Sequence, residues 1–460
     1  MNYREEYDTM GSVQVPEDAY YGAQTQRAVE NFDVSGLVFH PSFFRALGMV
    51  KKYAAKVNME LGLLDPEIAG AVFAAADEVQ SGKFDDHFVL DVFQTGSGTS
   101  TNMNANEIIA RRANEILTGN HDSKSPIHPN DHVNKGQSSN DVIPTTIHIA
   151  ALTEIRYRLV LAMEKLAASL AKKAEEFKDV MKIGRTHLQD AVPITLGNEF
   201  SGYARQAELS IARIKSAQGS LSELALGGTA VGNGLNTHPE FAAKVIELIA
   251  QETGCPFKEA VNHFEAQAAQ DAAVETSGAL KTVAVSLAKI ANDIRWLASG
   301  PRCGIGEINL PSLQPGSSIM PGKVNPVMPE MVIQVAAQVI GNDTAITYGG
   351  QGGIFELNVM QPLIAYNLLH SISLLERVIL RFIEKCVDGI TANREKCVSN
   401  IERSLAMSTV LAPVIGYEKA AAISKQAYEE GKTVREVALS AKVLPEEEIN
   451  KLLDDAIRGQ

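Results

Sequence analysis

Long stripes of apolar residues at helical spacing dominate the middle of the chain. The first stripe has the average spacing of an α-helical turn and consists of Leu152, Ile155, Leu159, Met163, Leu166 and Leu170. The second alternates by three and four residues, as in helices that pack nearly parallel, and consists of Leu280, Val283, Leu287, Ile290, Ile294 and Leu297. The third follows Pro362 and consists of Ile364, Leu368, Ile372, Leu375, Ile379 and Phe382. Nothing of comparable length alternates with period two, so the sequence predicts an almost wholly α-helical protein with long bundle helices between about 139 and 361.

Composition narrows the class of protein. A chain of 460 residues with 45% hydrophobic residues can bury a large core. The net charge of −13 argues against a nucleic-acid partner, because neutralising phosphates needs a basic face. No uninterrupted apolar run approaches ~18 residues, and Met1–Glu6 has neither a signal-peptide nor a transit-peptide pattern, so we expect no membrane association and a cytoplasmic location. The four cysteines lack metal or redox spacing, which predicts reduced thiols that serve packing.

A loop rich in glycine and proline carries the densest set of reactive groups. Nine of the 23 residues from Gly300 to Gly322 are Gly or Pro, so neither a helix nor a sheet ladder can continue through them. Two hydroxyls, one cation and one amide follow within ten positions, in Gly316–Pro326. Such a loop predicts a mobile lid that could face an anion gaining charge during a reaction.

Four segments resemble those of the fumarase and aspartase superfamily, whose members add or remove a group across the double bond of fumarate or a fumaryl compound. In chain order they are Gln94–Thr99 with Asn102 and Asn104, Gln137–Asp141, Gly184–Asp190 and Gly316–Pro326. The similarity extends from Tyr20 to Tyr417, and the chain is most similar to class II fumarases. This resemblance implies three helical domains, at 1–138, 139–361 and 362–460. It also implies a homotetramer whose central helices form one core and whose active sites each draw on three chains.

The resemblance further implies reversible hydration of fumarate to (S)-malate, without cofactor or metal. Ser317 would be the base that removes the carbon-bound proton, and backbone N–H groups of its loop, with Lys323 nearby, could lower its pKa. His187 would activate water or protonate the departing hydroxyl, which suits an imidazole at neutral pH. Glu330 would be the carboxylate partner of His187, with Asp190 as a rival. Pro329 is expected at the first position of a helix, which would place Glu330 in its first turn.

Further residues are expected to bind the dicarboxylate, and Lys323 is also expected to assist catalysis by stabilising the negative charge that develops on it. Lys323 and Asn325 would grip the carboxylate that accumulates charge, with Ser318 and Val324 beside them. The other substrate-binding candidates are Ser97, Gly98, Thr99, Ser138, Ser139, Asn140 and Thr186. Ser139 and Asn140 also suit helix capping, and a helix N-terminus is itself an anion site.

A second carboxylate-binding site outside the catalytic pocket is implied for His128, Pro129, Asn130 and Asp131. His128 and His132 also have the spacing of a metal pair, but Pro129 disfavours a helix across them and a third ligand is missing, so no metal is predicted.

Other members of the superfamily remain alternatives. Thr95, Ser97 and Ser139 stand where aspartases carry other residues, which favours fumarase. At the end of the lid loop, Val327-Met328-Pro329 is more similar to the residues that aspartases carry there. Aspartate ammonia-lyase therefore stays the main alternative. Argininosuccinate and adenylosuccinate lyases differ around the histidine. A crystallin-like structural protein is disfavoured because Ser317, His187, Lys323 and Asn325 are all present.

Overall fold

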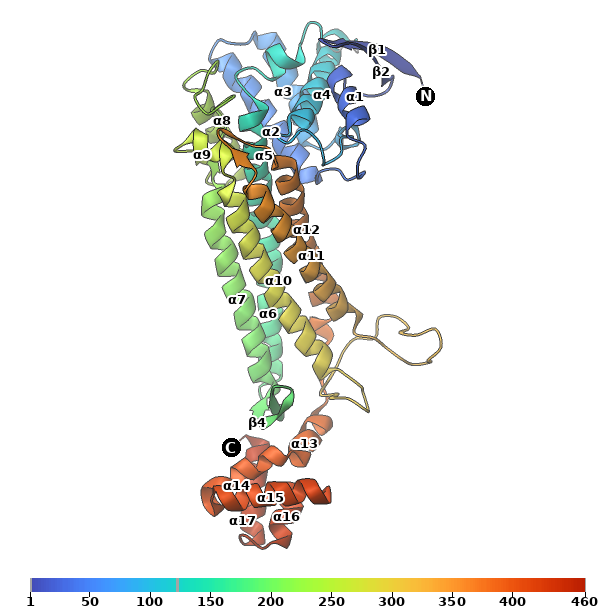
Figure 1. Ribbon diagram of the computed structural model, residues 1–460, viewed down its shortest axis with the longest axis vertical. Helices are drawn as coiled ribbons and strands as arrows, with labels where there is room; N and C mark the ends of the chain where they lie inside the picture. The colour runs from blue at the N-terminus through green and yellow to red at the C-terminus, as the bar shows by residue number, and fades with distance from the viewer. Residues whose placement is uncertain (1, 121–123, 460) are drawn as a thin grey trace. The chain divides into compact units, whose positions relative to one another are not determined.

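The computed structural model describes residues 2–120 and 124–459, which divide into two compact units (Figure 1). The first comprises Met1–Leu161, Ala212–Ala284 and Ala337–Glu376, and the second comprises Ala162–Ile211, Val285–Ala336 and Arg377–Gln460. In the described part of the chain, seventeen α-helices dominate and the sheets have only two strands each, which confirms the predicted all-α class. The division into three domains stays a prediction.

Three long apolar stripes were predicted, and all three are buried. Every residue in them is at most 5% exposed. They lie on long helices, which are α5 (Ser139–Glu154), α6 (Val160–Glu176), α10 (Asp271–Leu297) and α12 (Gln361–Lys385). The first stripe runs from α5 to α6 through a π-helical turn, η3 (Ile155–Leu159), so the helical run is unbroken there. The remaining long helices of this set are α7 (Leu196–Leu221) and α11 (Val327–Gly350).

Polar pairs within the first unit join the long helices. Asp343 on α11 accepts hydrogen bonds from Ser277 at 2.8 Å and Lys281 at 2.6 Å, both on α10. Asn342 donates to Ser371 on α12 at 3.0 Å. These contacts fix the rotation of each helix about its axis, because a slipped helix would leave buried polar groups unpaired.

The N-terminal helices of the first unit pack as a compact group (Figure 1). α2 (Pro41–Glu60) lies on α3 (Pro66–Gln80), and both begin with proline after a capping residue, His40 and Asp65. The other elements of this unit are β1 (Tyr3–Asp8), β2 (Gly11–Pro16), α1 (Ala23–Asn31), η1 (Asp85–His87), α4 (Thr99–Thr118), η2 (Pro129–Val133), β5 (Glu223–Leu224), α8 (Phe241–Thr253), β6 (Lys258–Glu259), α9 (His263–Ala268), β8 (Gly353–Ile354) and β9 (Leu357–Asn358).

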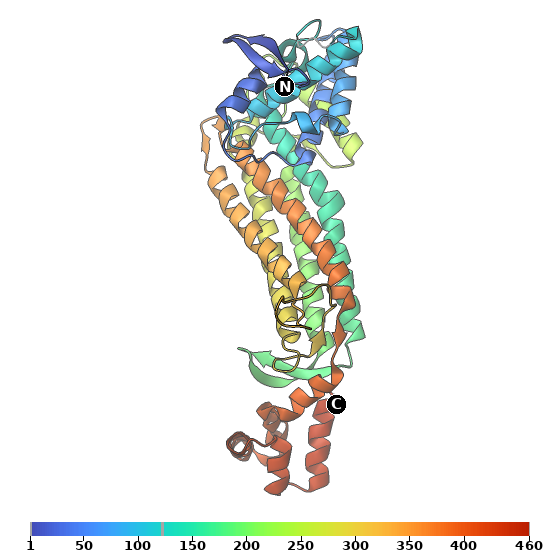
Figure 2. The same cartoon turned by 90° about the vertical axis from the view of Figure 1, so that its right-hand side faces the viewer.

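The second unit contains a β-hairpin that the sequence did not predict. β3 (Met181–Thr186) pairs antiparallel with β4 (Gln189–Thr195), and Figure 2 shows the pair as an extended ribbon. The sequence gives no period-two signal here because β3 buries a charged residue, Lys182, so its side chains do not alternate between apolar and polar as a half-buried strand usually does.

The C-terminal helices of the second unit share a small core. It includes Ile401, Leu411, Ile423, Val437 and Leu453, all buried. The elements of this region are η4 (Val387–Gly389), β10 (Thr391–Ala392), α13 (Arg394–Arg403), η5 (Leu405–Met407), α14 (Ser408–Ile415), α15 (Tyr417–Glu430), α16 (Val434–Ser440) and α17 (Glu446–Arg458). β10 pairs with β7 (Ile308–Asn309), which is the one strand inside the Gly- and Pro-rich loop in the described residues.

One stretch, Gln361–Gly389, is long and apolar enough to cross a membrane by length and hydropathy alone. However, 61% of its most apolar window is buried within the structure. Its hydrophobicity is therefore explained by the packing of α12 among other helices.

Candidate functional site

The N-termini of α4 and α5 meet through a chain of hydroxyl groups. Ser97 Oγ lies 2.7 Å from Thr99 Oγ1, and Thr99 Oγ1 lies 2.6 Å from Ser139 Oγ. Gly98, between the first two, has φ +74, and an added Cβ would lie 2.9 Å from Ile143 Cγ1. Glycine is therefore required there, and the structure brings Ser97, Thr99 and Ser139 together as predicted.

A buried carboxylate attaches a loop to this pair of helix ends. Asp141 Oδ1 accepts from the N–H of Ser138 at 3.0 Å, in the capping box that starts α5. Its Oδ2 accepts from the N–H groups of Gly227 at 3.0 Å and Thr229 at 2.9 Å. Asn140, predicted as a substrate ligand, donates to the carbonyl of Ala230 at 2.8 Å and so holds the same loop. The segment Gly227–Ala230 thus becomes one wall of a pocket.

This pocket, with a volume of about 370 Å³, will be called the hydroxyl pocket. Its twelve lining residues are Thr99, Asn102, Met103, Asn134, Gly136, Gln137, Ser138, Ser139, Thr229, Ala230, Leu235 and Asn236. None of them carries a formal charge. Eight of the twelve come from the start of α4 or from the start of α5 and the loop before it, and the other four come from the loop that holds Thr229 and Asn236. A pocket of neutral donors next to two helix N-termini suits a carboxylate ligand.

A lysine is buried behind the hydroxyl pocket. Lys51 on α2 is fully buried, and its Nζ donates to Asn134 Oδ1 at 3.0 Å and Gln137 Oε1 at 2.9 Å. Burial lowers the pKa of Lys51 to about 7, while the charge of Asp141 opposes this decrease. Lys51 therefore contacts two amide side chains of the pocket lining, those of Asn134 and Gln137.

The predicted site loop of the second unit closes on itself. The N–H of Gly316 donates to the carbonyl of Lys323 at 2.7 Å, and Asn325 Nδ2 donates to the carbonyl of Gly316 at 2.8 Å. Inside this loop, Ser317 Oγ accepts from the backbone N–H groups of Ile319 at 3.2 Å and Met320 at 3.1 Å. Two N–H groups therefore converge on the hydroxyl that was predicted to act as a base. Figure 1 shows the segment between α10 and α11 as irregular chain.

The other candidates of this loop are open to solvent. Ser318, Lys323 and Val324 are exposed, and Val324 is not packed against the helices. Asn325 is half-buried because one of its N–H groups closes the loop, which leaves its carbonyl oxygen and second N–H for a ligand.

His187 lies at the tip of the β3–β4 hairpin. Thr186 pairs with Gln189, so His187 and Leu188 form a two-residue turn with φ +57 and φ +58. Such a turn requires positive φ at both positions and is usually made by Gly or Asn. A histidine held there is strained and exposed, as functional residues often are. Thr186, the neighbouring substrate candidate, is also exposed.

The base of this hairpin is held by a buried ion cluster. Glu307, fully buried, accepts from Arg185 Nη1 at 2.9 Å and Nη2 at 2.7 Å. Lys182 Nζ lies 3.3 Å from Glu307 Oε2 and 2.9 Å from Glu199 Oε1. Arg185 and Lys182 both belong to β3, the strand that leads to His187. This strand is therefore held by ion pairs as well as by its hydrogen bonds to β4.

The predicted carboxylate partners of His187 lie in different elements. Asp190 pairs with Arg185 across the hairpin ladder, and Glu330 lies in the first turn of α11. α11 begins at Val327, so Pro329 is its third residue and the expected first-position proline was wrong. Among the described residues, His187 forms a hydrogen bond with neither carboxylate. Its partner therefore stays a prediction.

The predicted second carboxylate site forms a single π-helical turn, η2, in the first unit. His128 caps it, with Nδ1 accepting from the N–H groups of Asn130 at 3.3 Å and Asp131 at 3.4 Å. His132 Nδ1 in turn accepts from the N–H of His128 at 2.9 Å. In the described residues, no three His, Cys, Asp or Glu side chains gather as metal ligands would.

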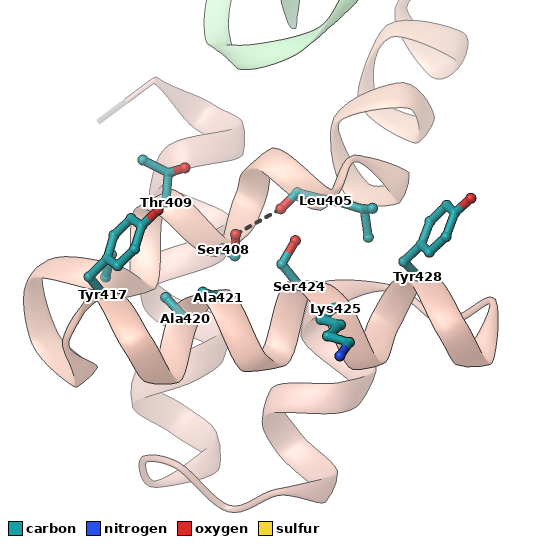
Figure 3. Close-up of a pocket in the computed structure, with 10 residues that line it drawn as sticks. Leu405, Ser408, Thr409, Tyr417, Ala420, Ala421, Ser424, Lys425 and Tyr428 are labelled. Atoms are coloured by element: carbon teal, nitrogen blue, oxygen red, sulfur yellow. Dashed lines mark hydrogen bonds between the residues drawn. The ribbon is translucent and has the colours of Figure 1, made fainter.

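A larger pocket lies between α14 and α15, with a volume of about 490 Å³ (Figure 3). Tyr417 and Tyr428 stand at its two ends, and small residues and hydroxyls line the space between. Lys425 is its one charged residue, and its ten lining residues include no carboxylate or imidazole. Its lining includes no residue of the four segments that resemble the fumarase and aspartase superfamily, so it is not the candidate catalytic site.

Several residues of the hydroxyl pocket were not selected from the sequence. Asn102 and Gln137 were noted only as parts of matching segments, and Asn134 and Thr229 were not singled out as ligands. One signal was available: Asn102, Asn104 and Asn106 are three amides in the first half of a predicted helix, where buried amides need partners.

Comparisons with known proteins identify the family of the chain. Residues 11–341 match the family described as "Lyase", and residues 407–456 match "Fumarase C C-terminus". The chain is 55% identical over 452 residues to a class II fumarate hydratase of Nitrosomonas europaea, covering 98% of each chain. It is 54% identical to fumarate hydratase 2 of Arabidopsis thaliana, covering 98% of this chain and 90% of that protein. The crystal structure of a class II fumarase from Schistosoma mansoni superposes with a TM-score of 0.95 at 39% identity, covering 99% and 98% of the two chains.

Proposed function

This chain belongs to the class II fumarase family, and on that premise we propose that it catalyses the reversible hydration of fumarate to (S)-malate. The observation that carries the proposal is the 55% identity to a class II fumarate hydratase over nearly the whole of both chains. Aspartate ammonia-lyase, the alternative raised by Val327-Met328-Pro329, is not favoured, because the relatives reported above are fumarate hydratases. The direct test is conversion of fumarate by the purified protein without ammonia.

We propose Ser317 as the base. In the malate-to-fumarate direction its alkoxide takes the proton from C3, and the electron pair left behind is delocalised onto the adjacent carboxylate. A serine needs help to lose its own proton. The N–H groups of Ile319 and Met320, which point at Oγ, would stabilise the alkoxide in the way an oxyanion hole does.

We propose His187 as the acid that completes the elimination. The C2–O bond of malate breaks as the imidazolium donates a proton, and the hydroxyl leaves as water. In hydration the neutral imidazole removes a proton from the attacking water. Its position at a hairpin tip, anchored through Arg185 to Glu307, would keep the ring in a defined place while leaving it accessible.

We propose that two sets of donors divide the substrate between them. The hydroxyl pocket, with Ser97, Gly98, Thr99, Ser138, Ser139 and Asn140, would bind one end together with Thr186. Ser318, Lys323, Val324 and Asn325 would bind the end whose carboxylate gains charge, because a mobile ammonium can follow a growing negative charge. His128, Pro129, Asn130 and Asp131 would form the second carboxylate site, and no cofactor or metal is needed for these steps.

We propose a homotetramer in which three chains contribute to each active site. Large apolar side chains on the long helices support this assembly. Val285 and Trp296 on α10 are 53% and 45% exposed, and Tyr348 on α11 is 68% exposed. Apolar side chains at such exposure on bundle helices favour burial against other copies of the chain.

We propose that the enzyme acts in the cytoplasm. Three of its four cysteines are buried and all four are free, which suits a reducing compartment. Relatives are named both as a bacterial enzyme and as mitochondrial enzymes, so location among relatives varies.

A further inference from the structure

Asn134 lies between a buried cation and the hydroxyl pocket. Its Oδ1 accepts three hydrogen bonds, from Lys51 Nζ at 3.0 Å, Asn102 Nδ2 at 3.2 Å and Asn106 Nδ2 at 3.2 Å. Its Nδ2 donates to the carbonyl of Gln137 at 3.2 Å. All four hydrogen bonds therefore require the same orientation of the Asn134 amide, with its oxygen toward Lys51.

The lysine also determines how Asn102 is oriented. Below its pKa of about 7 Lys51 is an ammonium group, which has only donors, so Asn134 must turn its oxygen toward Lys51. That oxygen can only accept, so Asn102 must turn its NH₂ group toward Asn134. The Oδ1 atom of Asn102 consequently faces away from Asn134. A flipped amide at either position would set two donors or two acceptors against each other.

Asn102 Oδ1 is a buried acceptor without a donor. Asn102 is 2% exposed and lines the hydroxyl pocket, and no described residue donates to this atom. Thr229 Oγ1, also buried and in the pocket lining, is likewise without a partner. Buried polar atoms are normally paired, so unpaired ones in a pocket wall point to a ligand that completes them.

The ligand must supply a hydrogen-bond donor to Asn102. Ionised carboxylates are acceptors only, so neither end of a dicarboxylate can satisfy this oxygen. Malate carries one donor, its C2 hydroxyl, whereas fumarate carries none. We propose that Asn102 is a further substrate-contacting residue, whose Oδ1 accepts a hydrogen bond from the C2 hydroxyl of malate. This inference rests on the proposed hydratase function.

Lys51 is then a positioning residue. It contacts no ligand, but it fixes Asn134 and, through it, the acceptor that Asn102 offers. Replacing Lys51 should release both amides to rotate, so the preference for a hydroxyl-bearing ligand should fall even though the pocket residues are intact.

The experiment measures ligand selectivity by titration calorimetry. In the full-length Ser317→Ala protein, which binds malate without turning it over, dissociation constants are measured for (S)-malate and for succinate, which lacks the hydroxyl. Adding Asn102→Ala should weaken malate binding about three- to tenfold, as expected for one hydrogen bond, and succinate binding less than about twofold. Lys51→Met in the same background should also reduce the ratio of the two constants.

Two matched controls separate this role from general packing. Asn106→Ala removes the same hydrogen bond to Asn134 Oδ1, but Asn106 does not line the pocket, so selectivity should be retained. Lys52→Met removes a neighbouring buried lysine that pairs with Asp77 and Glu252, and it should also leave selectivity unchanged. If Asn102→Ala does not fold, Asn102→Ser provides a small polar side chain too short to reach both partners.

The possible results differ clearly. Equal weakening of malate and succinate by Asn102→Ala, or no weakening of either, would overturn the assignment while leaving the hydratase proposal intact. If the Ser317→Ala parent binds neither dicarboxylate, the hydratase proposal itself fails, and the role of Asn102 fails with it.

Discussion

Arg185 and Glu307 form a two-point ion pair, with Nη1 and Nη2 of the guanidinium 2.9 and 2.7 Å from the two carboxylate oxygens. Glu307 is fully buried, and Lys182 on the same strand is buried beside it. Glu307, together with Glu199 at 2.9 Å from Lys182 Nζ, therefore neutralises two cations on the strand that leads to His187. Removing a single charge from such a cluster leaves the others uncompensated.

Replacing Glu307 with Gln should destabilise the protein by about 3–5 kcal/mol, because Lys182 would remain buried without sufficient negative charge. Thermal unfolding followed by circular dichroism should show a large decrease in Tm. The control is Arg394→Gln, which removes an exposed ion pair with Asp179 and should leave Tm nearly unchanged, because solvent screens such a pair. Equal Tm changes in the two variants would contradict the role given to the cluster.

The same cluster predicts sensitivity to acid. Burial alone would raise the pKa of Glu307, but the hydrogen bond from Arg185 and the charge of Lys182 outweigh it and hold the pKa below its usual value. A lowered carboxyl pKa stabilises the fold above the unfolded-state pKa near ~4.3, and this stabilisation is lost as pH falls through the folded-state value. The hairpin ladder should therefore lose amide-exchange protection in acid.

The buried Lys51 should make the stability of the protein depend on pH in the neutral to alkaline range. Burial lowers its pKa to about 7, so between pH 7 and the unfolded-state value near ~10.4 the unfolded chain binds the extra proton. Stability from this group should rise with pH across that window. The difference in Tm between wild type and Lys51→Met should accordingly change in favour of wild type between pH 7 and pH 9.

Lys52 provides the matched comparison for Lys51. Burial would lower its pKa, but Asp77 and Glu252 outweigh burial and raise it, so Lys52 stays protonated in both states across the same window. The Tm difference between wild type and Lys52→Met should not change from pH 7 to pH 9. Parallel behaviour of the two variants would show that Lys51 is not the titrating group.

The long helices were predictable because burial leaves a periodic trace in the sequence. Residues such as Leu159, Ile290 and Leu368 repeat at helical spacing and are all fully buried. The hairpin was not predictable in this way, because Lys182 is buried through ion pairs and His187 takes a turn position normally filled by Gly or Asn. The first exception depends on ion pairs of Lys182 with Glu199 and Glu307, which the local sequence does not reveal.

The candidate site shows the same division. Ser97, Thr99 and Ser139 were selected by motif, and their hydroxyls do meet. Asn134 and Lys51 were not selected, because their contribution depends on a contact between residues 83 positions apart. Local sequence identifies groups that can touch a ligand, whereas the groups that orient them become visible only in the fold.

Replacing Ser317 with Ala should lower turnover by several orders of magnitude while Tm stays within about 1 °C, because its hydroxyl contacts only backbone N–H groups of its own loop. Steady-state kinetics and thermal unfolding measure both. Ser312→Ala, an exposed serine earlier in the same loop, is the control and should retain wild-type turnover. Near-normal turnover of Ser317→Ala would eliminate Ser317 as the base.

Sharing of the active site between chains predicts complementation. Inactive Ser317→Ala and inactive His187→Asn chains, unfolded together and refolded as mixed tetramers, should regain activity well above either parent, because some pockets would receive the intact serine from one variant and the intact histidine from the other. Mixing the folded parent tetramers without exchange of subunits should restore no activity. Confirmed hybrids that remain inactive would show that the two residues of one pocket come from the same chain.

The most direct measurement of the central claim is fumarate consumption by the purified wild-type protein in ammonia-free, chelator-treated buffer, followed by the loss of fumarate absorbance. The proposed function predicts rapid conversion to an equilibrium mixture with (S)-malate, and the same equilibrium when the reaction starts from malate. Ser317→Ala provides the inactive control. No conversion in this buffer, together with rapid ammonia release from aspartate, would contradict the account and identify an aspartate ammonia-lyase instead.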